Sequence, residues 1–194
     1  ATGRWRRPGG YREIIVLAVP LVLSTSSWTI QHFVDRMFLS WYDPAAMAAA
    51  MPAGLLAFTI VSFFIGTASY ANTFVAQYEG SGQRRRVGPA IWQAIYFSIA
   101  AGLLLPFFGL LSDPIFTWVG HEHHVMVLES TYFKIMLVGS IFAIYGSAVS
   151  SFFTGLGRNW PVLWINISVT AINLLLDYAL IFGNWGFPES GITG

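Results

Sequence analysis

The sequence contains no cysteine and few charged residues. The lack of cysteine excludes disulfides and thiol chemistry, although it says little about the compartment. Charged residues make up 10% of the 194 residues, whereas soluble domains carry about 25%. Fingerprints for phosphate loops, nucleotide binding, zinc peptidases and serine nucleophiles are also missing. We therefore expect neither an enzyme nor a cofactor-binding protein.

The chain instead contains long runs of apolar residues. Hydrophobic residues make up 55% of the chain, and mean hydropathy is +0.61. Five stretches without any charged residue cover residues 14–34, 44–78, 87–112, 135–157 and 159–176. A helix needs roughly 20 apolar residues to cross a bilayer, whereas barrel strands are about 10 residues long and alternate in polarity. The sequence predicts an all-α integral membrane protein with about five transmembrane helices, at residues 11–37, 46–78, 88–111, 131–153 and 161–183.

The basic residues predict the orientation of these spans. Eight of the ten precede the first span or lie in two of the loops: Arg4, Arg6, Arg7, Arg12, Arg84, Arg85, Arg86 and Arg158. Because basic loops stay on the cytoplasmic side, residues 1–10 are expected to form a cytoplasmic N-terminal segment. The protein is then multi-pass in the cell (inner) membrane, with its N-terminus in the cytoplasm. The three consecutive arginines are expected to contact membrane lipid, not nucleic acid.

Two aspartates stand inside the predicted spans, and each ends a polar stripe. The fifth span carries Asn166, Thr170, Asn173 and Asp177, and the first carries Ser24, Trp28, Gln31 and Asp35. Spacings of three and four residues place such side chains on one helical face. A charge within a span costs about 2.5–3.5 kcal/mol and usually faces the interior of a helix bundle. We expect Asp35 and Asp177 to face each other toward the outer ends of their helices.

A carboxylate pair in this position has two chemical uses. Burial and a second carboxylate both favour the neutral form of a carboxyl group, so the pair can hold and release a proton. The same oxygens, with the Asn173 amide, can also bind a small cation such as sodium. The sequence leaves both uses open. A structural alternative places Asp35 at the lipid headgroups beside Arg36 and treats Asp177 as a buried, hydrogen-bonded residue.

Three other features give weaker signals. Pro20 removes a backbone hydrogen bond from the first span and predicts a kink, which is either static or moving. The segment "HEHH" at residues 121–124 is expected to be a solvated outer loop and not a metal site. A face of small residues on the fourth span is expected to serve helix packing; it consists of Gly139, Ala143, Gly146 and Ser150.

Several stretches together resemble a known family. They are "LAVPLVLSTSSWTIQHFVDRMFLS", "VAQYEGSGQRRRVG", "FFTGLGRNWP" and "INLLLDYALIFGNWGFPESGITG", and they resemble the N-terminal half of multidrug and toxic compound extrusion (MATE) transporters. The resemblance implies twelve helices in two six-helix lobes. Residues 11–194 would then form the N-terminal transmembrane lobe up to its fifth helix, and the sixth helix and the C-terminal lobe are expected as the remaining half.

The resemblance also implies a function. Members export small organic, often cationic compounds in exchange for protons or sodium ions (H+ or Na+). Asp35 matches the family's main ion-coupling residue, Asn173 and Asp177 match a pair on the fifth helix, and Pro20 matches a proline proposed to bend. Arg36 and the "SWY" after Leu39 depart from the common pattern. We therefore expect a cation-coupled antiporter that works by alternating access. The alternatives are a flippase for lipid-linked saccharides and a membrane interaction subunit that transports nothing.

Overall fold

The computed structural model describes residues 10–193 and is helical almost throughout. The helices are α1 Tyr11–Tyr42, α2 Pro44–Ser69, α3 Ala71–Gly80, α4 Val87–Phe108, α5 Ser112–Val119, α6 His123–Gly155 and α7 Asn159–Phe182, with 3-10 turns at Arg84–Arg86, Gly109–Leu111 and Gly191–Thr193. Five helical segments are long and apolar enough to cross a membrane. The predicted all-α class with about five spans is thereby confirmed. The predicted cytoplasmic segment lies, apart from Gly10, outside the described residues.

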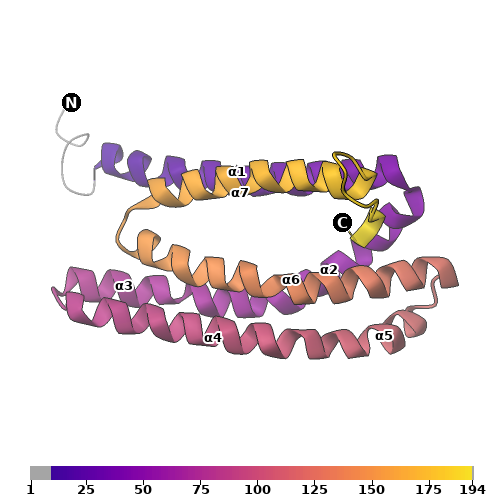
Figure 1. The fold of residues 1–194 in the computed structure, drawn as a ribbon. Helices are drawn as coiled ribbons and strands as arrows, with labels where there is room; N and C mark the ends of the chain where they lie inside the picture. The colour runs from indigo at the N-terminus through magenta and orange to yellow at the C-terminus, as the bar shows by residue number, and fades with distance from the viewer. Residues whose placement is uncertain (1–9, 194) are drawn as a thin grey trace.

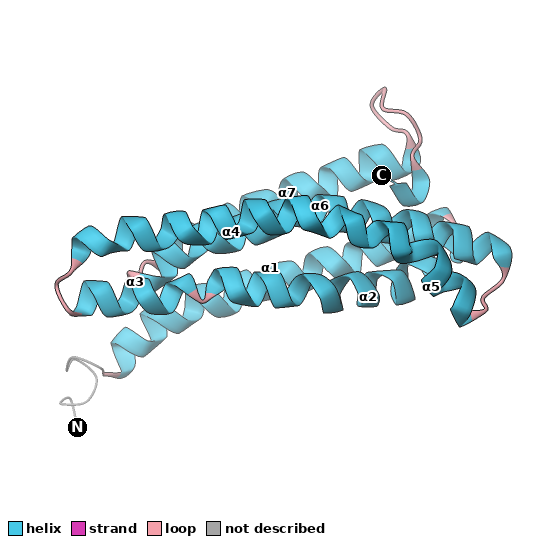
Figure 2. Ribbon diagram, turned by 90° about the horizontal axis from the view of Figure 1, so that it is seen from below, coloured by secondary structure: helices cyan, strands magenta, loops and turns pink. Residues whose placement is uncertain are grey.

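The helices form two groups that lie along a common direction (Figure 1). α1 and α7 pair with each other, although they come from opposite ends of the chain, while α6 packs against both α2 and α4 in the second group. The α3–α4 and α6–α7 connections lie at one end, and the α1–α2 and α5–α6 connections lie at the other. Figure 2 shows the loops gathered at these two ends. This arrangement places the ends of α1 and α7 next to each other.

A seam of small residues on α6 brings that helix close to the backbone of α2 and α3. The Ser147 hydroxyl donates to the Ile65 carbonyl at 3.4 Å, and the Ser151 hydroxyl donates to the Ser69 carbonyl at 3.1 Å. One turn further on, a Cβ placed on Gly155 would lie 2.6 Å from Cβ of Val75. Small residues four apart permit this close approach of two helices in a membrane, where van der Waals contact replaces the hydrophobic effect.

The small-residue face expected on the fourth span has a different environment. Gly139 and Gly146 are exposed, and a Cβ added to either would meet nothing within 4 Å in the part of the chain that the structure describes. The contacts of α6 use the adjacent face, which carries Phe133, Leu137 and Ile144, all fully buried. The prediction that this face serves helix packing is therefore wrong for contacts among residues 10–193. Two faces of one helix can both be rich in small residues, and only the neighbouring helix decides which one packs.

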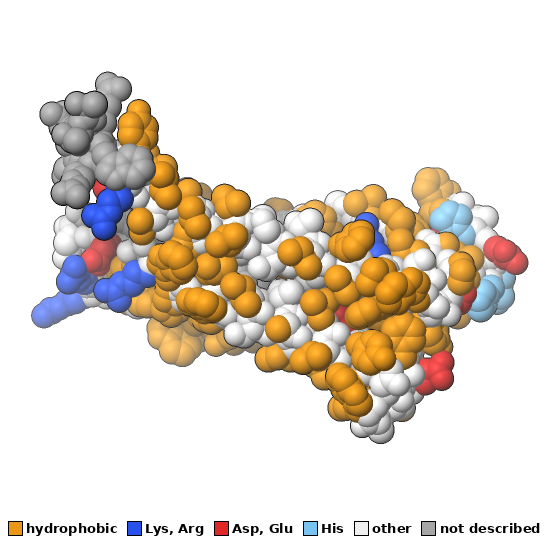
Figure 3. Space-filling view, turned by 90° about the horizontal axis from the view of Figure 1, so that it is seen from above, with side chains coloured by type: hydrophobic (Ala, Val, Ile, Leu, Met, Phe, Trp, Pro, Cys, Tyr) orange, Lys and Arg blue, Asp and Glu red, His pale blue; other side chains and the backbone are white. Residues whose placement is uncertain are grey.

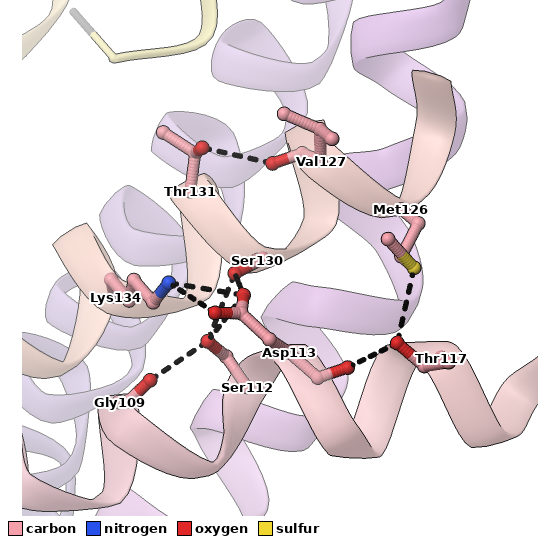
Figure 4. A network of polar contacts seen from close by, with 9 residues as sticks. All are labelled: Gly109, Ser112, Asp113, Thr117, Met126, Val127, Ser130, Thr131 and Lys134. Carbon is pink, nitrogen blue, oxygen red and sulfur yellow. Dashed lines mark hydrogen bonds and ion pairs between the residues drawn. The ribbon is translucent and has the colours of Figure 1, made fainter. Parts of the chain in front are cut away.

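The segment between the third and fourth predicted spans contains the short helix α5. A polar network ties α5 to the start of α6 (Figure 4). The Asp113 carboxylate accepts from the Ser130 hydroxyl and from Nζ of Lys134, the latter at 3.1 Å. The Ser112 hydroxyl lies 2.9 Å from that of Ser130 and donates to the Gly109 carbonyl at 2.7 Å. These bonds satisfy the polar groups where the chain turns from α4 into α5.

The histidine-rich segment at residues 121–124 is exposed, as expected, but it also contains a specific contact. Nδ1 of His121 lies 2.7 Å from Oε1 of Glu129, and Glu129 is fully buried. His123 and His124 begin α6. His121 therefore serves as the hydrogen-bonding partner of a buried carboxyl group. The sequence hides this pairing because eight residues separate the two side chains.

We expect His121→Ala to destabilise the protein more than Lys134→Ala. The first change leaves the buried Glu129 carboxyl without its partner, which costs about 1–3 kcal/mol. The second removes an ion pair to Asp113, whose side chain is 67% exposed, and exposed ion pairs contribute little. Thermal unfolding of the two purified variants, followed by tryptophan fluorescence, measures the difference. Equal stability of the two variants would contradict this assignment.

Candidate ion site between α1 and α7

α1 and α7 contact each other at three levels along their length. At the end that carries the α3–α4 and α6–α7 connections, Nδ2 of Asn159 donates to the Leu17 carbonyl at 2.9 Å. Halfway along, the Thr170 hydroxyl donates to Oε1 of Gln31 at 3.3 Å. At the opposite end, the rings of Phe38 and Phe182 lie 5.9 Å apart. The two helices therefore lie side by side over most of their length.

The polar stripe of α7 faces α1. Asn166, Thr170, Asn173 and Asp177 are half-buried, whereas the intervening positions, except Leu174, are exposed. On α1, Ser24, Gln31 and Asp35 are likewise half-buried, but Trp28 is 49% exposed. Trp28 instead packs its ring edge-on against His32, with the ring centres 4.7 Å apart. The spacing argument therefore identified the facing residues except for the tryptophan.

The structure brings Asp35, Asn173 and Asp177 together. Nδ2 of Asn173 donates to Oδ1 of Asp177 at 3.3 Å, and the carboxyl groups of Asp35 and Asp177 are close enough to interact with each other. Within residues 10–193, one buried oxygen of each of the three side chains has no hydrogen-bond partner: Oδ1 of Asp35, Oδ1 of Asn173 and Oδ2 of Asp177. Buried oxygens normally have a partner. This cluster therefore has the oxygen ligands that a proton or a small cation needs.

Two residues near the cluster were missed by the sequence analysis. Nδ1 of His32 lies 3.9 Å from Oδ2 of Asp35, one helical turn away on α1. Tyr132 of α6 lies close enough to Asp35, Arg36 and Asp177 to interact electrostatically with all three. The spacing of His32 from Asp35 was a usable signal, because residues three apart are neighbours on a helix. Nothing in the sequence pointed to Tyr132, which belongs to the other helix group.

An apolar cluster lies beyond the carboxylates, toward the end of the bundle that carries the α1–α2 connection. Leu39 and Ile181 are buried in it, and they follow Asp35 and Asp177 by one helical turn. Phe38, Tyr132 and Phe182 pack against the cluster. Arg36, by contrast, is exposed and makes no ion pair with Asp35 in the described structure. The carboxylates therefore lie below an apolar layer and not at an exposed helix end.

Pro20 is fully buried within α1, which continues past it as a helix. After it comes a run of hydroxyl side chains that bond back to carbonyls four residues earlier. Thr25 donates to Leu21 at 2.7 Å, and Ser26 donates to Val22 at 2.9 Å. Such back-bonding slightly destabilises and often bends helices, and proline removes a further bond. The segment between Pro20 and the acidic cluster thus combines two features that weaken the backbone hydrogen bonding of α1.

Similarity to solved structures defines the fold. The chain resembles a MOP superfamily transporter from Pyrococcus furiosus, with a TM-score of 0.84 and 18% identity over 93% of this chain and 40% of that one. It also resembles a MATE structure in complex with MaD3S, with a TM-score of 0.83 and 18% identity. That alignment covers 93% of this chain and 41% of the other. Together with the five spans, this makes the chain a multi-pass membrane protein with the fold of these transporters.

The sequence comparisons identify the family. The MatE family model matches residues 20–179, and the chain belongs to this family, whose members are transporters and not enzymes. It is 29% identical to a probable multidrug resistance protein NorM of Synechocystis, over 94% of this chain and 40% of that protein. It is 26% identical to multidrug resistance protein PmpM of Pseudomonas aeruginosa, over 94% and 39%. The chain spans about 40% of the length of these relatives.

Proposed function

We propose that this chain forms the ion-coupling part of an antiporter that exports small organic compounds in exchange for protons or sodium ions. Asp35 and Asp177 bind the coupling ion, and Asn173 supports them with its amide oxygen. Gln31, Thr170 and Asn166 continue the polar face between the two helices. Pro20 permits α1 to bend as the ion binds or leaves.

The observation that carries the proposal is the group of three buried oxygens without partners. A bound cation contacts all three, a proton bridges the two carboxyl groups, and an empty site leaves two close carboxylates that repel each other. Occupancy of the site therefore changes the free energy of holding α1 against α7. A ligand shifts a conformational equilibrium only through such a difference. Two relatives of the chain are named multidrug resistance proteins, and this supports the proposal that the cargo is a small organic compound.

Orientation and partners belong to the same proposal. The arginine-rich end lies in the cytoplasm of a cell with an inner membrane, because basic loops are retained on that side. The exposed apolar surface of α1 and α7 then faces lipid or the other helices of the complete transporter. The sixth helix and the C-terminal lobe are expected to supply those helices.

Gradient-driven efflux tests the proposal. The full-length protein is reconstituted in proteoliposomes with a fluorescent organic cation. Efflux is measured with an imposed pH gradient in the absence of sodium, and separately with a sodium gradient at constant pH. Efflux that depends on one of the gradients supports the proposal and identifies the ion. Efflux that ignores both, or translocation of lipid-linked saccharide alone, would reject it.

We expect Asp177→Asn to weaken ion coupling without abolishing it. Asp35 still binds the ion, but one negative charge is lost beside it, and charge interactions over such distances amount to a few kcal/mol at most near a protein surface. The concentration of coupling ion for half-maximal efflux should rise by about tenfold, which corresponds to about 1.4 kcal/mol. Asp43→Asn is the matched control. The Asp43 carboxylate caps α2 by accepting from the Ala45 amide, and asparagine is an equally good cap. An unchanged half-maximal concentration in Asp177→Asn would argue against its role.

A further inference from the structure

A hollow with a volume of about 320 Å³ opens at the basic end of the bundle. It lies where the ends of α3 and α6 meet the starts of α4 and α7. Its lining consists of Glu79, Arg84, Val87, Phe152, Leu156 and Arg158. Figure 3 shows most of the arginine and lysine side chains gathered at this end, opposite the end that carries the histidines.

The two arginines of the hollow differ in their pairing. Arg84 is held by Glu79 through two bonds, Nη2 to Oε1 at 2.6 Å and Nε to Oε2 at 3.1 Å. The Arg158 side chain makes no hydrogen bond or ion pair with residues 10–193. Since the lining holds two arginines and a single acidic residue, Glu79 at the end of α3, the hollow keeps a net positive charge. Among residues 10–193, no acidic side chain pairs with Arg158.

The remaining lining is apolar and belongs to the ends of membrane-spanning helices. Val87 is buried at the start of α4, while Phe152 and Leu156 are half-buried at the end of α6. A ligand that fits must therefore combine an anionic group for Arg158 with an apolar part for these side chains. Free phosphate has no such apolar part, whereas an anionic phospholipid has both.

We propose that this hollow binds the phosphodiester headgroup of an anionic phospholipid such as phosphatidylglycerol. Arg158 donates to the phosphate oxygens, because its planar guanidinium suits bidentate phosphate contacts. Arg84, fixed by Glu79, lines the opposite side. No side chain caps the first backbone amides of α7. These amides and the positive end of the helix dipole therefore also favour an anion at this position. The bound lipid joins the α3–α4 and α6–α7 connections, and the proposal is independent of the coupling ion.

Lipid titration of the full-length protein in detergent tests this site. Native mass spectrometry measures the affinity for short-chain phosphatidylglycerol, with phosphatidylcholine of the same chain length as the neutral comparison. Arg158→Gln should weaken phosphatidylglycerol binding by about tenfold, as expected for a charged hydrogen bond of about 1.5 kcal/mol. Arg85→Gln is the matched control, because Arg85 is exposed in the same loop region but does not line the hollow. It should change the affinity by less than about twofold.

Equal weakening by the two substitutions would overturn the site in favour of a diffuse surface charge, which contributes about 1 kcal/mol for each basic residue. If millimolar inorganic phosphate displaces bound phosphatidylglycerol, the hollow is a site for a free anion and not for a lipid. Arg158→Lys keeps the charge and loses the bidentate geometry, so it covers the case in which Arg158→Gln fails to fold. It should show an affinity between those of the wild type and the glutamine variant, and wild-type affinity would contradict the proposed bidentate contact.

Discussion

Asp35→Asn should abolish ion-driven efflux while leaving the amount of folded protein unchanged. Asparagine has nearly the same shape but carries no charge, so it neither accepts a proton nor neutralises a cation at this position. Asp35 has a buried oxygen without a partner, and its nearest basic group is His32 at 3.9 Å. A bound ion would give that oxygen a partner, whereas the uncharged amide of asparagine does not attract one.

The expected size of this effect follows from coupling free energies. Typical couplings of about 1–3 kcal/mol correspond to about 5- to 150-fold changes, and loss of the principal charge should reach the upper part of that range. Gradient-driven efflux in proteoliposomes measures the rate, and size-exclusion chromatography measures the folded amount. Glu122→Gln is the matched change of an exposed carboxylate at the same end of the bundle, and it should transport normally. Unchanged efflux in Asp35→Asn would remove this residue from the coupling site.

Gly155→Ala should destabilise the whole helix bundle. A Cβ at this position would lie 2.6 Å from Cβ of Val75 and 2.9 Å from the carbonyl oxygen of Asn72. Val75 is itself fully buried, and a backbone carbonyl moves only with its helix. Relief of the clash therefore requires α3 and α6 to separate. Overpacking of this kind typically costs about 1–3 kcal/mol.

The direction of this effect distinguishes packing from helix propensity. Alanine favours a helix over glycine by roughly 0.5–1 kcal/mol, so propensity alone predicts a more stable protein. Gly146→Ala is the matched control, because nothing described lies within 4 Å of the added methyl group, and it should be neutral or slightly stabilising. The fraction of protein that remains monodisperse after heating compares the variants. Equal heat resistance of Gly155→Ala and Gly146→Ala would show that the α3–α6 seam tolerates a wider spacing.

Much of the candidate site was predictable from spacing alone. The bilayer requires long apolar helices, and a helix places residues three and four apart on one face. Asn166, Thr170, Asn173 and Asp177 accordingly share the face of α7 that meets α1. Trp28 follows the same spacing on α1 but lies at the margin of the contact, because a periodicity indicates a direction and not the width of the facing surface.

Partners from other helices were not predictable. Tyr132 near the carboxylates and the pairing of His121 with Glu129 depend on how α6 packs. The sequence contains the seam through Ser147, Ser151 and Gly155 and also a second small-residue face, whose two glycines have open space beside them in the described structure. Membrane helices lack a hydrophobic driving force between them. Local shape therefore decides which face packs.

The sequence by itself determined the membrane class, the number of spans and the two polar faces, because each follows from local composition and helical periodicity. Only the tertiary structure decided that α1 pairs with α7, that three unpartnered oxygens meet there, and that Arg84 is neutralised while Arg158 is not. These features depend on contacts between residues far apart in the chain, such as Leu17 with Asn159 and Gln31 with Thr170. No local pattern records such contacts, since they arise from the fit of one helix surface against another.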